Sequence, residues 1–528
     1  MAAHDILLGP ILGYEWDDTA SQAYYTVIVR TTKGATAPVW QVDGQNVTMT
    51  GLQTLHDGTR VWRGEVPLAP FTEPKGRTVN YTIRRADTAL KNVCGDARWS
   101  FHLPGVATPR QQPRIGFCSC NGFTDPNALR DMNPLALWER MATKHQTAPL
   151  SLLLMGGDQL YCDDLARKEG SFARFWTWLD PKDRAKTKPT KEEFKKSYLD
   201  HYLLAWARIQ HEGKDHPHTA MVRMMASVPS VMMWDDHDIF DGWGSYQNAE
   251  TKQPYYKEAF DAARDAFELY QIRGGKANRS LLDRDHSGAP RHYSQAVHFG
   301  PFHILVMDNR SHRTPNQIMD NNQWSQILKW LGREDNQPPS GKKDRRTLLV
   351  VSPVPVVYRR FQDWVSSMPG EHSGEDDLRD HWSHHSHEGE RDRLVYHLFN
   401  VLNQGGNMGK YSRVTLLSGD VHVGALGFLE RTDNGAEIAQ VVSSAIIHPA
   451  PTPMAWLGLL AISSDADHGI QGQPVTARMA RPVGAKDRYQ RCRNYAWLQE
   501  GDDQKLWVNW ECEKGDRDDP ERVHFPLK

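Results

Sequence analysis

Six short and almost uninterrupted apolar runs follow residue 113, and they constrain the fold more than any other feature. They cover residues 115–118, 150–155, 231–234, 302–307, 347–351 and 414–417. Runs of this length are typical of strands that are covered on both faces. Amphipathic helical stretches lie between the runs. The alternation predicts an α/β fold for this part of the chain.

Local signals mark several helix ends. Asn133 is the expected N-cap of one helix, with Pro134 at its first position. Two stripes at helical spacing predict further helices, each followed by a glycine pair. They are Phe260, Ala263, Phe267 and Tyr270 before Gly274-Gly275, and Leu394, Leu398 and Val401 before Gly405-Gly406.

The first hundred residues follow a different pattern. Val79, Tyr81 and Ile83 alternate with polar residues, and the runs 25–31 and 39–42 are also β-rich. Asp57-Gly58 lies between two such segments and predicts a hairpin. We therefore expect residues 1–105 to form a β-sandwich domain of the immunoglobulin or fibronectin kind. After a linker at Pro104–Pro113, residues 113–528 would form a second, α/β domain, with loop insertions and a β-rich C-terminal extension.

Composition excludes several classes of protein. The 63 Lys and Arg residues nearly balance the 65 Asp and Glu residues, so the whole-chain charge of −2 gives no case for binding nucleic acid or an anionic membrane. The six cysteines show neither zinc-ligand spacing nor the density of a disulfide scaffold. The longest apolar run, 454–462, is too short to span a bilayer. No signal peptide is evident, which predicts a cytoplasmic protein unless a leader has been removed. The oligomeric state stays open.

Chemistry-bearing residues follow four of the six apolar runs. They are Ser119, Cys120 and Asn121; Asp158, Tyr161 and Asp163; Asp235, Asp236, His237 and Asp238; and Asp420 and His422. A single Asp after a strand is usually a turn residue or a helix cap, and a lone Cys is usually a small buried hydrophobe. Turns, caps and buried packing explain less well why four strand ends all carry residue types that bind metals. Because ligands bind at the strand ends of open α/β sheets, the pattern predicts a pair of metals there.

The ordered motifs FCSC, GDQLY, WDDHDIFDGWGS, MDNRS, DHW and SGDVH resemble the PhoD-like (alkaline phosphatase D) family of calcineurin-like metallophosphoesterases. The resemblance spans about residues 114 to 430, and the N-terminal β region also fits that family. WDDHD and SGDVH are specific in this order, whereas FCSC or GDQLY alone would be weak. The resemblance implies an αββα sandwich with a dinuclear metal site.

The resemblance also implies a set of metal ligands. Asp158 would bridge the two metals, Cys120, Tyr161 and His422 would complete the first site, and Asp236 and Asp420 would bind the second. Family members of this type use iron(III) and calcium. A thiolate and a phenolate suit iron(III), and an oxygen-rich site suits a hard cation. Manganese, zinc and magnesium are the other candidates.

Two further residues receive catalytic roles from the resemblance. His237 would stand beside the scissile bond as general acid, and Arg310 would hold the phosphate. Asp235 and Asp238 would orient their neighbours. The predicted reaction is in-line attack on phosphorus by a hydroxide that the metals activate, without a covalent phosphoenzyme. The substrate would be a small-molecule phosphomonoester or phosphodiester, and the sequence does not decide which.

Some features leave alternatives open. No obvious residue supplies the additional imidazole that many superfamily members place on the second metal, and Asn309 is a substitute. The tract DHWSHHSHEGER holds His381, His384, His385 and His387, and is either a solvated loop or a source of one substrate or metal contact. A non-catalytic binding protein that keeps its metals for stability is the rival hypothesis. A metallo-oxidase or peroxidase is a weaker third.

Overall fold

A computed structural model describes most of the chain. It covers residues 5–34, 36–106, 113–123, 132–163, 190–211, 214–245, 254–333, 346–361, 380–404, 409–513 and 521–528. Most of the expected linker and the Gly405-Gly406 pair lie outside these residues. No helix among the described residues has the length and the apolar character that a bilayer crossing requires.

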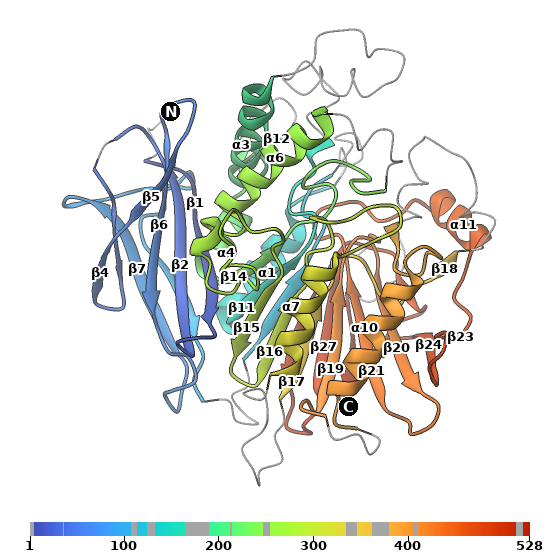
Figure 1. The fold of residues 1–528 in the computed structure, drawn as a ribbon. Coiled ribbons are helices and arrows are strands. Elements are labelled where there is room, and N and C mark those ends of the chain that lie inside the picture. Colours follow the sequence, from blue (N-terminus) through green and yellow to red (C-terminus); the bar gives the residue numbers. More distant parts are fainter. Residues whose placement is uncertain are drawn as a thin grey trace.

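The largest sheet has ten strands and runs through both halves of the chain (Figure 1). Its order is β28 (Arg522–Leu527), β27 (Leu506–Cys512), β26 (Asn494–Glu500), β10 (Ile115–Cys118), β11 (Leu152–Gly156), β14 (Ser230–Met233), β1 (Ile6–Asp17), β2 (Gln22–Thr31), β6 (Arg60–Pro67) and β5 (Thr50–Thr54). β10, β11 and β14 are parallel, whereas the C-terminal strands add antiparallel through β26. The β-rich C-terminal extension thus continues the sheet that carries β10 and β11.

A nine-stranded sheet forms the second layer. It contains β15 (Gln295–Phe299), β16 (Phe302–Val306), β17 (Thr347–Val351), β19 (Arg413–Ser418), β21 (Glu437–Ser443), β20 (Gly424–Arg431), β24 (Val475–Ala480) and β23 (His468–Gly469), with β25 (Tyr489–Gln490) beside β20. The run from β16 through β17 and β19 to β21 is parallel. All six apolar runs therefore form strands, as predicted.

Alternation along β17 shows how the layers stack. Leu349 and Val351 join the core that includes β10 and β11, whereas Leu348 and Val350 join the core under the outer helices. The helices are α1 (Ala136–Thr147), α3 (Lys191–Ala207), α4 (Thr219–Ser227), α6 (Pro254–Tyr270), α7 (Asn321–Gly332), α10 (Glu388–Val401) and α11 (Pro453–Ile462), with a short 3₁₀ turn η3 (Gly275–Ala277). Figure 1 shows α7 and α10 over the outer face of the second sheet. The fold is the expected αββα sandwich.

One helix start differs from the prediction. α1 begins at Ala136, and its N-cap, Leu135, makes no side-chain cap bond. Asn133 lies before the helix, where its Oδ1 accepts a hydrogen bond from the Leu135 backbone N at 2.9 Å. The Asn133 side chain therefore stabilises the turn that precedes the helix. The stripe through Phe267 and Tyr270 does form α6, as predicted.

The N-terminal region is all-β and packs as two sheets. β1, β2, β6 and β5 face a smaller sheet of β4 (Gln45–Thr48), β3 (Val39–Val42), β7 (Arg77–Arg85), β8 (Thr88–Ala89) and β9 (Trp99–Leu103). Tyr25 stacks on Phe101 across the two sheets, with ring centroids 5.1 Å apart. The Asp57-Gly58 hairpin joins β5 and β6, as predicted.

The N-terminal sheet is continuous with the sheet that contains β10, β11 and β14. β1 pairs in parallel with β14 at Gly13 and Ser230, and the Ser230 hydroxyl donates to the Leu12 carbonyl at 2.9 Å. The remaining connections are small ribbons of β12 (Arg208–His211) with β13 (Lys214–Pro217), and β18 (Arg360–Phe361) with β22 (Ser463–Ser464).

Candidate metal centre

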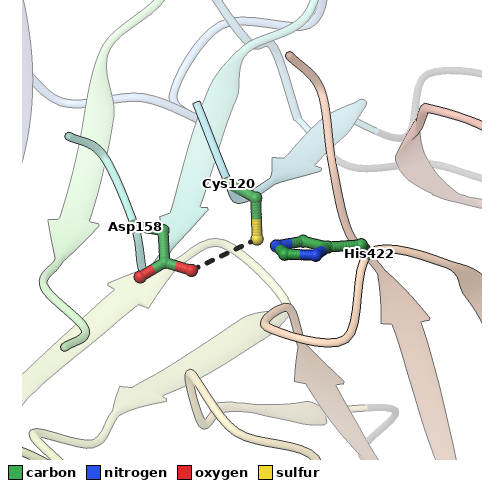
Figure 2. A group of neighbouring side chains, drawn as sticks. All are labelled: Cys120, Asp158 and His422. Carbon is green, nitrogen blue, oxygen red and sulfur yellow. Dashed lines mark hydrogen bonds between the residues drawn. The ribbon is translucent and has the colours of Figure 1, made fainter. Parts of the chain in front are cut away.

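The carboxyl ends of β10, β11, β14 and β19 meet at one edge of the sandwich. Cys120 follows β10, Asp158 follows β11, and His422 follows β19 (Figure 2). The Cys120 thiol donates a hydrogen bond to Asp158 Oδ2 at 3.3 Å. Residues far apart in the sequence are thus brought together because both sheets present their parallel strand ends at the same edge.

Among the described residues three groups could hold a metal, and Asp158 belongs to all three. In each group the ligand atoms lie within 4.8 Å of one another. The groups are Cys120, Asp158 and His422; Asp158, Asp236 and His237; and Asp158, Asp235, Asp236 and Asp420. A carboxylate that belongs to neighbouring ligand sets has the position that a bridge between two cations would need.

Backbone strain is concentrated in this cluster. Cys120, Asp158, Asp420 and His422 have φ values of 51°, 52°, 67° and 54°. Non-glycine residues rarely occupy this left-handed region, and they are held there mainly at functional sites. Gly419 explains part of the constraint, because a Cβ there would lie 2.2 Å from the Ser119 hydroxyl. The turns after β10 and β19 are therefore in direct contact.

The electrostatics of the cluster fit a cation. Asp158 Oδ1 and Asp235 Oδ2 are buried and have no hydrogen-bond partner among the described residues. Burial raises the pKa of Asp158 well above its ordinary value; His237 lowers this pKa, and the nearby carboxylates of Asp235 and Asp236 raise it further. A buried carboxylate without a counter-charge is costly, and a bound cation removes that cost.

Tyr161 and His422 complete one side of the cluster. The Tyr161 hydroxyl lies 3.1 Å from His422 Nε2 and donates to Asp158 Oδ2 at 3.5 Å. Burial, with His448 and His237 nearby, lowers the pKa of His422, so its imidazole is neutral and able to bind a metal. His448 was not identified from the sequence. Its ring stacks on His422 with centroids 3.6 Å apart, and on Tyr161 at 5.2 Å.

His237 is held by a carboxylate that sequence reasoning left without a role. Its Nδ1 lies 2.5 Å from Asp163 Oδ2, and Asp163 Oδ1 accepts from the Asp241 backbone N at 2.9 Å. Burial lowers the pKa of His237, but Asp163 and Asp236 outweigh it and raise the pKa well above its ordinary value. With Nδ1 bonded to Asp163, Nε2 is the nitrogen left for other contacts.

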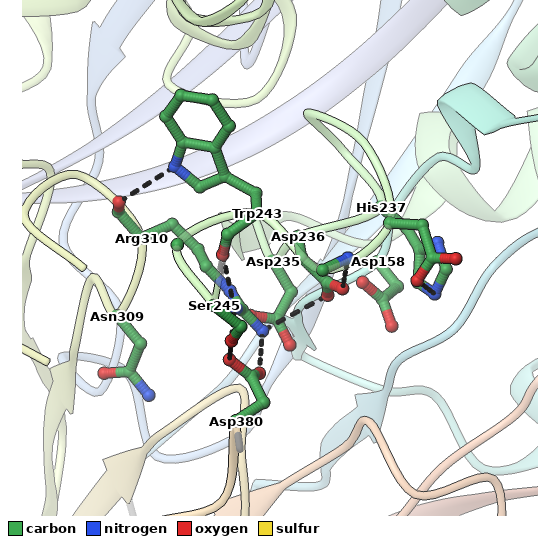
Figure 3. Close-up of polar contacts among 12 residues, drawn as sticks. Asp158, Asp235, Asp236, His237, Trp243, Ser245, Asn309, Arg310 and Asp380 are labelled. Atoms are coloured by element: carbon green, nitrogen blue, oxygen red, sulfur yellow. Dashed lines mark hydrogen bonds and ion pairs between the residues drawn. The ribbon is translucent and has the colours of Figure 1, made fainter. Parts of the chain in front are cut away.

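Arg310, the predicted phosphate contact, lies among carboxylates, and its phosphate role stays a prediction. The side chain is fully buried, and Figure 3 shows it surrounded by carboxylates. Nη1 donates to the Trp243 carbonyl at 3.0 Å and to Asp380 Oδ1 at 2.8 Å. Nη2 donates to Asp236 Oδ1 at 3.2 Å and to Asp380 Oδ2, and Nε donates to Asp235. These contacts occupy all five N–H donors of a guanidinium, and three carboxylates accept them together with the Trp243 carbonyl.

Asp238 orients its neighbours, as the sequence predicted. Asp238 Oδ2 accepts from the backbone N atoms of Asp235 and Gln159 at 2.8 and 3.1 Å, and Oδ1 accepts from Gln271 Nε2 at 2.8 Å. Asp235 is held by Arg310 but keeps one oxygen free of hydrogen bonds. Since Asp235 also belongs to one of the groups that could hold a metal, it could be a ligand itself.

Most of the histidine tract is not solvated. His381, His384 and His387 are buried, whereas His385 is exposed, and the metal-capable groups among the described residues include none of the four. Asp380 is the residue of this segment that reaches the site, through Arg310. Asn309 donates to the Ser352 hydroxyl at 2.9 Å, and its Oδ1 is buried without a hydrogen-bond partner in the described structure.

A comparison with known protein families identifies the family of this chain. The sequence matches the family described as PhoD related phosphatase over residues 118–368 and 361–466. That is more than half of the chain, and it includes all of the candidate ligands. This chain belongs to the PhoD related phosphatase family.

Relatives of this PhoD related phosphatase are distant. The Saccharomyces cerevisiae protein YGR266W, described as uncharacterized, is 27% identical over 390 residues, which span 63% of this chain and about half, 52%, of the yeast protein. The solved structure of PhoD is 14% identical, with a TM-score of 0.56 over 97% of this chain and 87% of PhoD. The yellow lupin purple acid phosphatase PPD1 is 12% identical, with a TM-score of 0.50 over 99% of this chain and 74% of that protein. At these identities the structures show a shared fold.

Proposed function

We propose that this chain hydrolyses phosphoric esters of small molecules at a dinuclear metal site bridged by Asp158. The observation that carries the proposal is the presence of Asp158 in all three ligand groups, with one of its oxygens buried and free of hydrogen bonds. A purely structural carboxylate would use both oxygens in hydrogen bonds, as Asp238 does.

The donor sets differ on the two sides of Asp158. Cys120, Tyr161 and His422 would hold the first metal, and this thiolate and phenolate set suits iron(III). Asp236 and Asp420 would hold the second, and this carboxylate set suits calcium or another hard divalent cation. When bound, the two cations would supply Lewis-acid chemistry, activating water near neutral pH and neutralising charge on a phosphoryl group.

The protein's own contribution centres on His237. Asp163 holds Nδ1, so Nε2 carries the proton that can be donated to a leaving oxygen. Arg310 acts at a distance from the substrate, because it fixes Asp236 and Asp235 through direct hydrogen bonds. In this proposal the bound metals would neutralise the phosphate charge, and Arg310 fixes the orientation of the carboxylates that would hold them.

A hydrolysis assay tests the proposal against a non-catalytic, metal-stabilised protein. The full chain is loaded with iron and calcium, or with manganese, and assayed with p-nitrophenyl phosphate and bis-p-nitrophenyl phosphate. The enzyme proposal is supported if the wild-type chain hydrolyses an ester and Asp158→Asn does not. Asp87→Asn is the control and should keep the activity, because Asp87 is an exposed residue of the N-terminal β region. A metal-loaded protein that cleaves neither ester contradicts it.

A further inference from the structure

Helix α11 presents an apolar surface to solvent. Its ten residues, Pro453–Ile462, include no charged side chain. Met454, Leu457 and Leu460 are 83%, 65% and 39% exposed, and these three residues are called the apolar face below. Large side chains grouped in this way on a surface mark an interaction site more often than chance exposure.

The exposure of the apolar face is built into the packing of the helix. The Thr452 hydroxyl caps the N-terminus by accepting from the Ala455 backbone N at 3.2 Å. Trp456 is the buried residue of the helix and packs against Tyr489, with ring centroids 5.2 Å apart. After the last turn, Ser463 Oγ accepts from the buried Arg359 Nε at 2.7 Å. These contacts fix the helix at both ends and at Trp456, and they leave the apolar face exposed.

Basic side chains lie beside Leu457 and Leu460 of the apolar face. Arg481, Lys486 and Arg488 are exposed, and these three residues are called the basic rim. A groove between α11 and the rim is lined by six basic side chains and two acidic ones: Arg359, Arg478, Arg481, Lys486, Arg488 and Arg491 against Asp465 and Asp487. Arg359 and Arg488 pair with Asp465, and Arg478 pairs with Glu430 and Glu437. The six basic side chains still outnumber these acidic partners and Asp487, so the local charge is positive although the chain as a whole carries −2.

The helix is also close to the candidate metal centre along the chain. His448, which stacks on His422, comes only five residues before α11 begins. After the helix, β22 pairs with β18, which follows the carboxyl end of β17. In Figure 1, α11 projects from the same end of the sandwich as these connections. A partner on α11 would therefore lie beside the site edge.

We propose that α11 and the basic rim dock this protein onto an anionic lipid surface without spanning it. An apolar helix flanked by Lys and Arg binds at a membrane interface, where its side chains enter the acyl boundary and its cations meet lipid phosphates. A symmetric dimer through the same face would bring two basic rims together, which like-charge repulsion opposes. The proposal is independent of the phosphatase activity.

Vesicle co-sedimentation of the full chain tests this proposal. Wild type should bind phosphatidylcholine vesicles that contain about one third phosphatidylserine, and should bind pure phosphatidylcholine at least about tenfold more weakly. Meanwhile Met454→Gln with Leu457→Gln, and separately Arg481→Ala with Lys486→Ala, should each reduce binding about tenfold. Tyr396→Gln on α10 is the matched control, because Tyr396 is 54% exposed and distant in sequence from the rim, and it should bind as wild type does.

Two results would overturn the proposal. One is wild-type protein that fails to sediment with either vesicle, or that binds both equally. The other is a wild-type protein that does not bind vesicles but forms a concentration-dependent dimer in analytical ultracentrifugation. If the Met454 and Leu457 substitutions dissociate this dimer, the apolar face binds a second copy of the chain. Since the substituted side chains are exposed, the melting temperature should not change, and a normal melt shows that the variants fold.

Discussion

At the scale of single residues, His237 illustrates what the structure adds to the sequence. The motif indicated a histidine beside the reacting bond, but the partner that fixes its ring, Asp163, became evident only from the fold. Asp163 follows β11 and His237 follows β14, so their contact depends on the pairing of those strands. A carboxylate that holds one imidazole nitrogen sets which nitrogen faces the substrate.

The acid role of His237 predicts a dependence on the leaving group. An alkoxide needs a proton to leave, whereas a nitrophenolate does not, and general-acid help is worth about 10² to 10⁴-fold. His237→Ala should therefore lose most of that factor in kcat/KM on an alkyl phosphate ester and much less on the nitrophenyl ester. Metal content is measured in parallel as the control. An equal fall on both esters, at unchanged metal content, would remove His237 from the acid role.

A substitution of Arg310 distinguishes an anchoring role of this residue from a phosphate-binding role. Arg310→Met leaves the buried carboxylates of Asp235, Asp236 and Asp380 without their shared cation. Removing one partner of a buried ion pair costs about 3–5 kcal/mol, so we expect a clear fall in melting temperature together with weaker metal binding. A phosphate-binding arginine would instead raise KM and leave stability unchanged, and differential scanning calorimetry beside steady-state kinetics distinguishes the two.

Tyr161 tests the identity of the first metal. A phenolate bound to iron(III) gives a visible charge-transfer band, and the Tyr161 hydroxyl lies beside both Asp158 and His422. The iron-loaded protein should be coloured, and Tyr161→Phe should lose the band. A colourless and fully active protein containing only divalent metals would exclude iron(III) and leave the hydrolase proposal intact.

At the scale of elements, much of the fold could be predicted, because buried parallel strands leave a strong pattern. All six apolar runs became strands, and four of them lead into the candidate site. The sequence could not show that β1 joins β14, since the first segment has no simple alternation and the pairing is non-local. His448 was missed because it follows β21, a strand not identified from the sequence, although the same strand-end signal applies to it.

The junction of β1 and β14 yields a stability prediction. A Cβ on Gly13 would lie 2.2 Å from Nε of the buried Arg273, whose Nη2 donates to the Ser230 carbonyl at 2.8 Å. Gly13→Ala should therefore destabilise the protein by about 1–3 kcal/mol through overpacking. Gly389→Ala on α10 is the control, because a Cβ there meets nothing within 4 Å. Thermal melts that rank the two variants equally would contradict the described junction.

At the scale of the whole molecule, the two sheets act as a frame for the strand ends. The parallel strands of both layers bring Cys120, Asp158, Asp236 and His422 to one edge, and the positive φ values of three of these residues show that the turns are constrained there. In our proposals this edge carries the hydrolytic site, and α11 beside it carries a lipid-facing surface. The predicted cytoplasmic location is compatible with both and remains a prediction.

The most direct test of the central claim is a metal titration of the metal-free protein, with bound metal and ester hydrolysis followed together. We predict that activity rises until two metal ions are bound per chain, and that Asp158→Asn binds neither ion tightly and stays inactive, because the shared carboxylate is lost from all three ligand groups. Full activity with a single bound ion, or an Asp158→Asn variant that retains two ions and hydrolyses the ester, would contradict the Asp158-bridged dinuclear site.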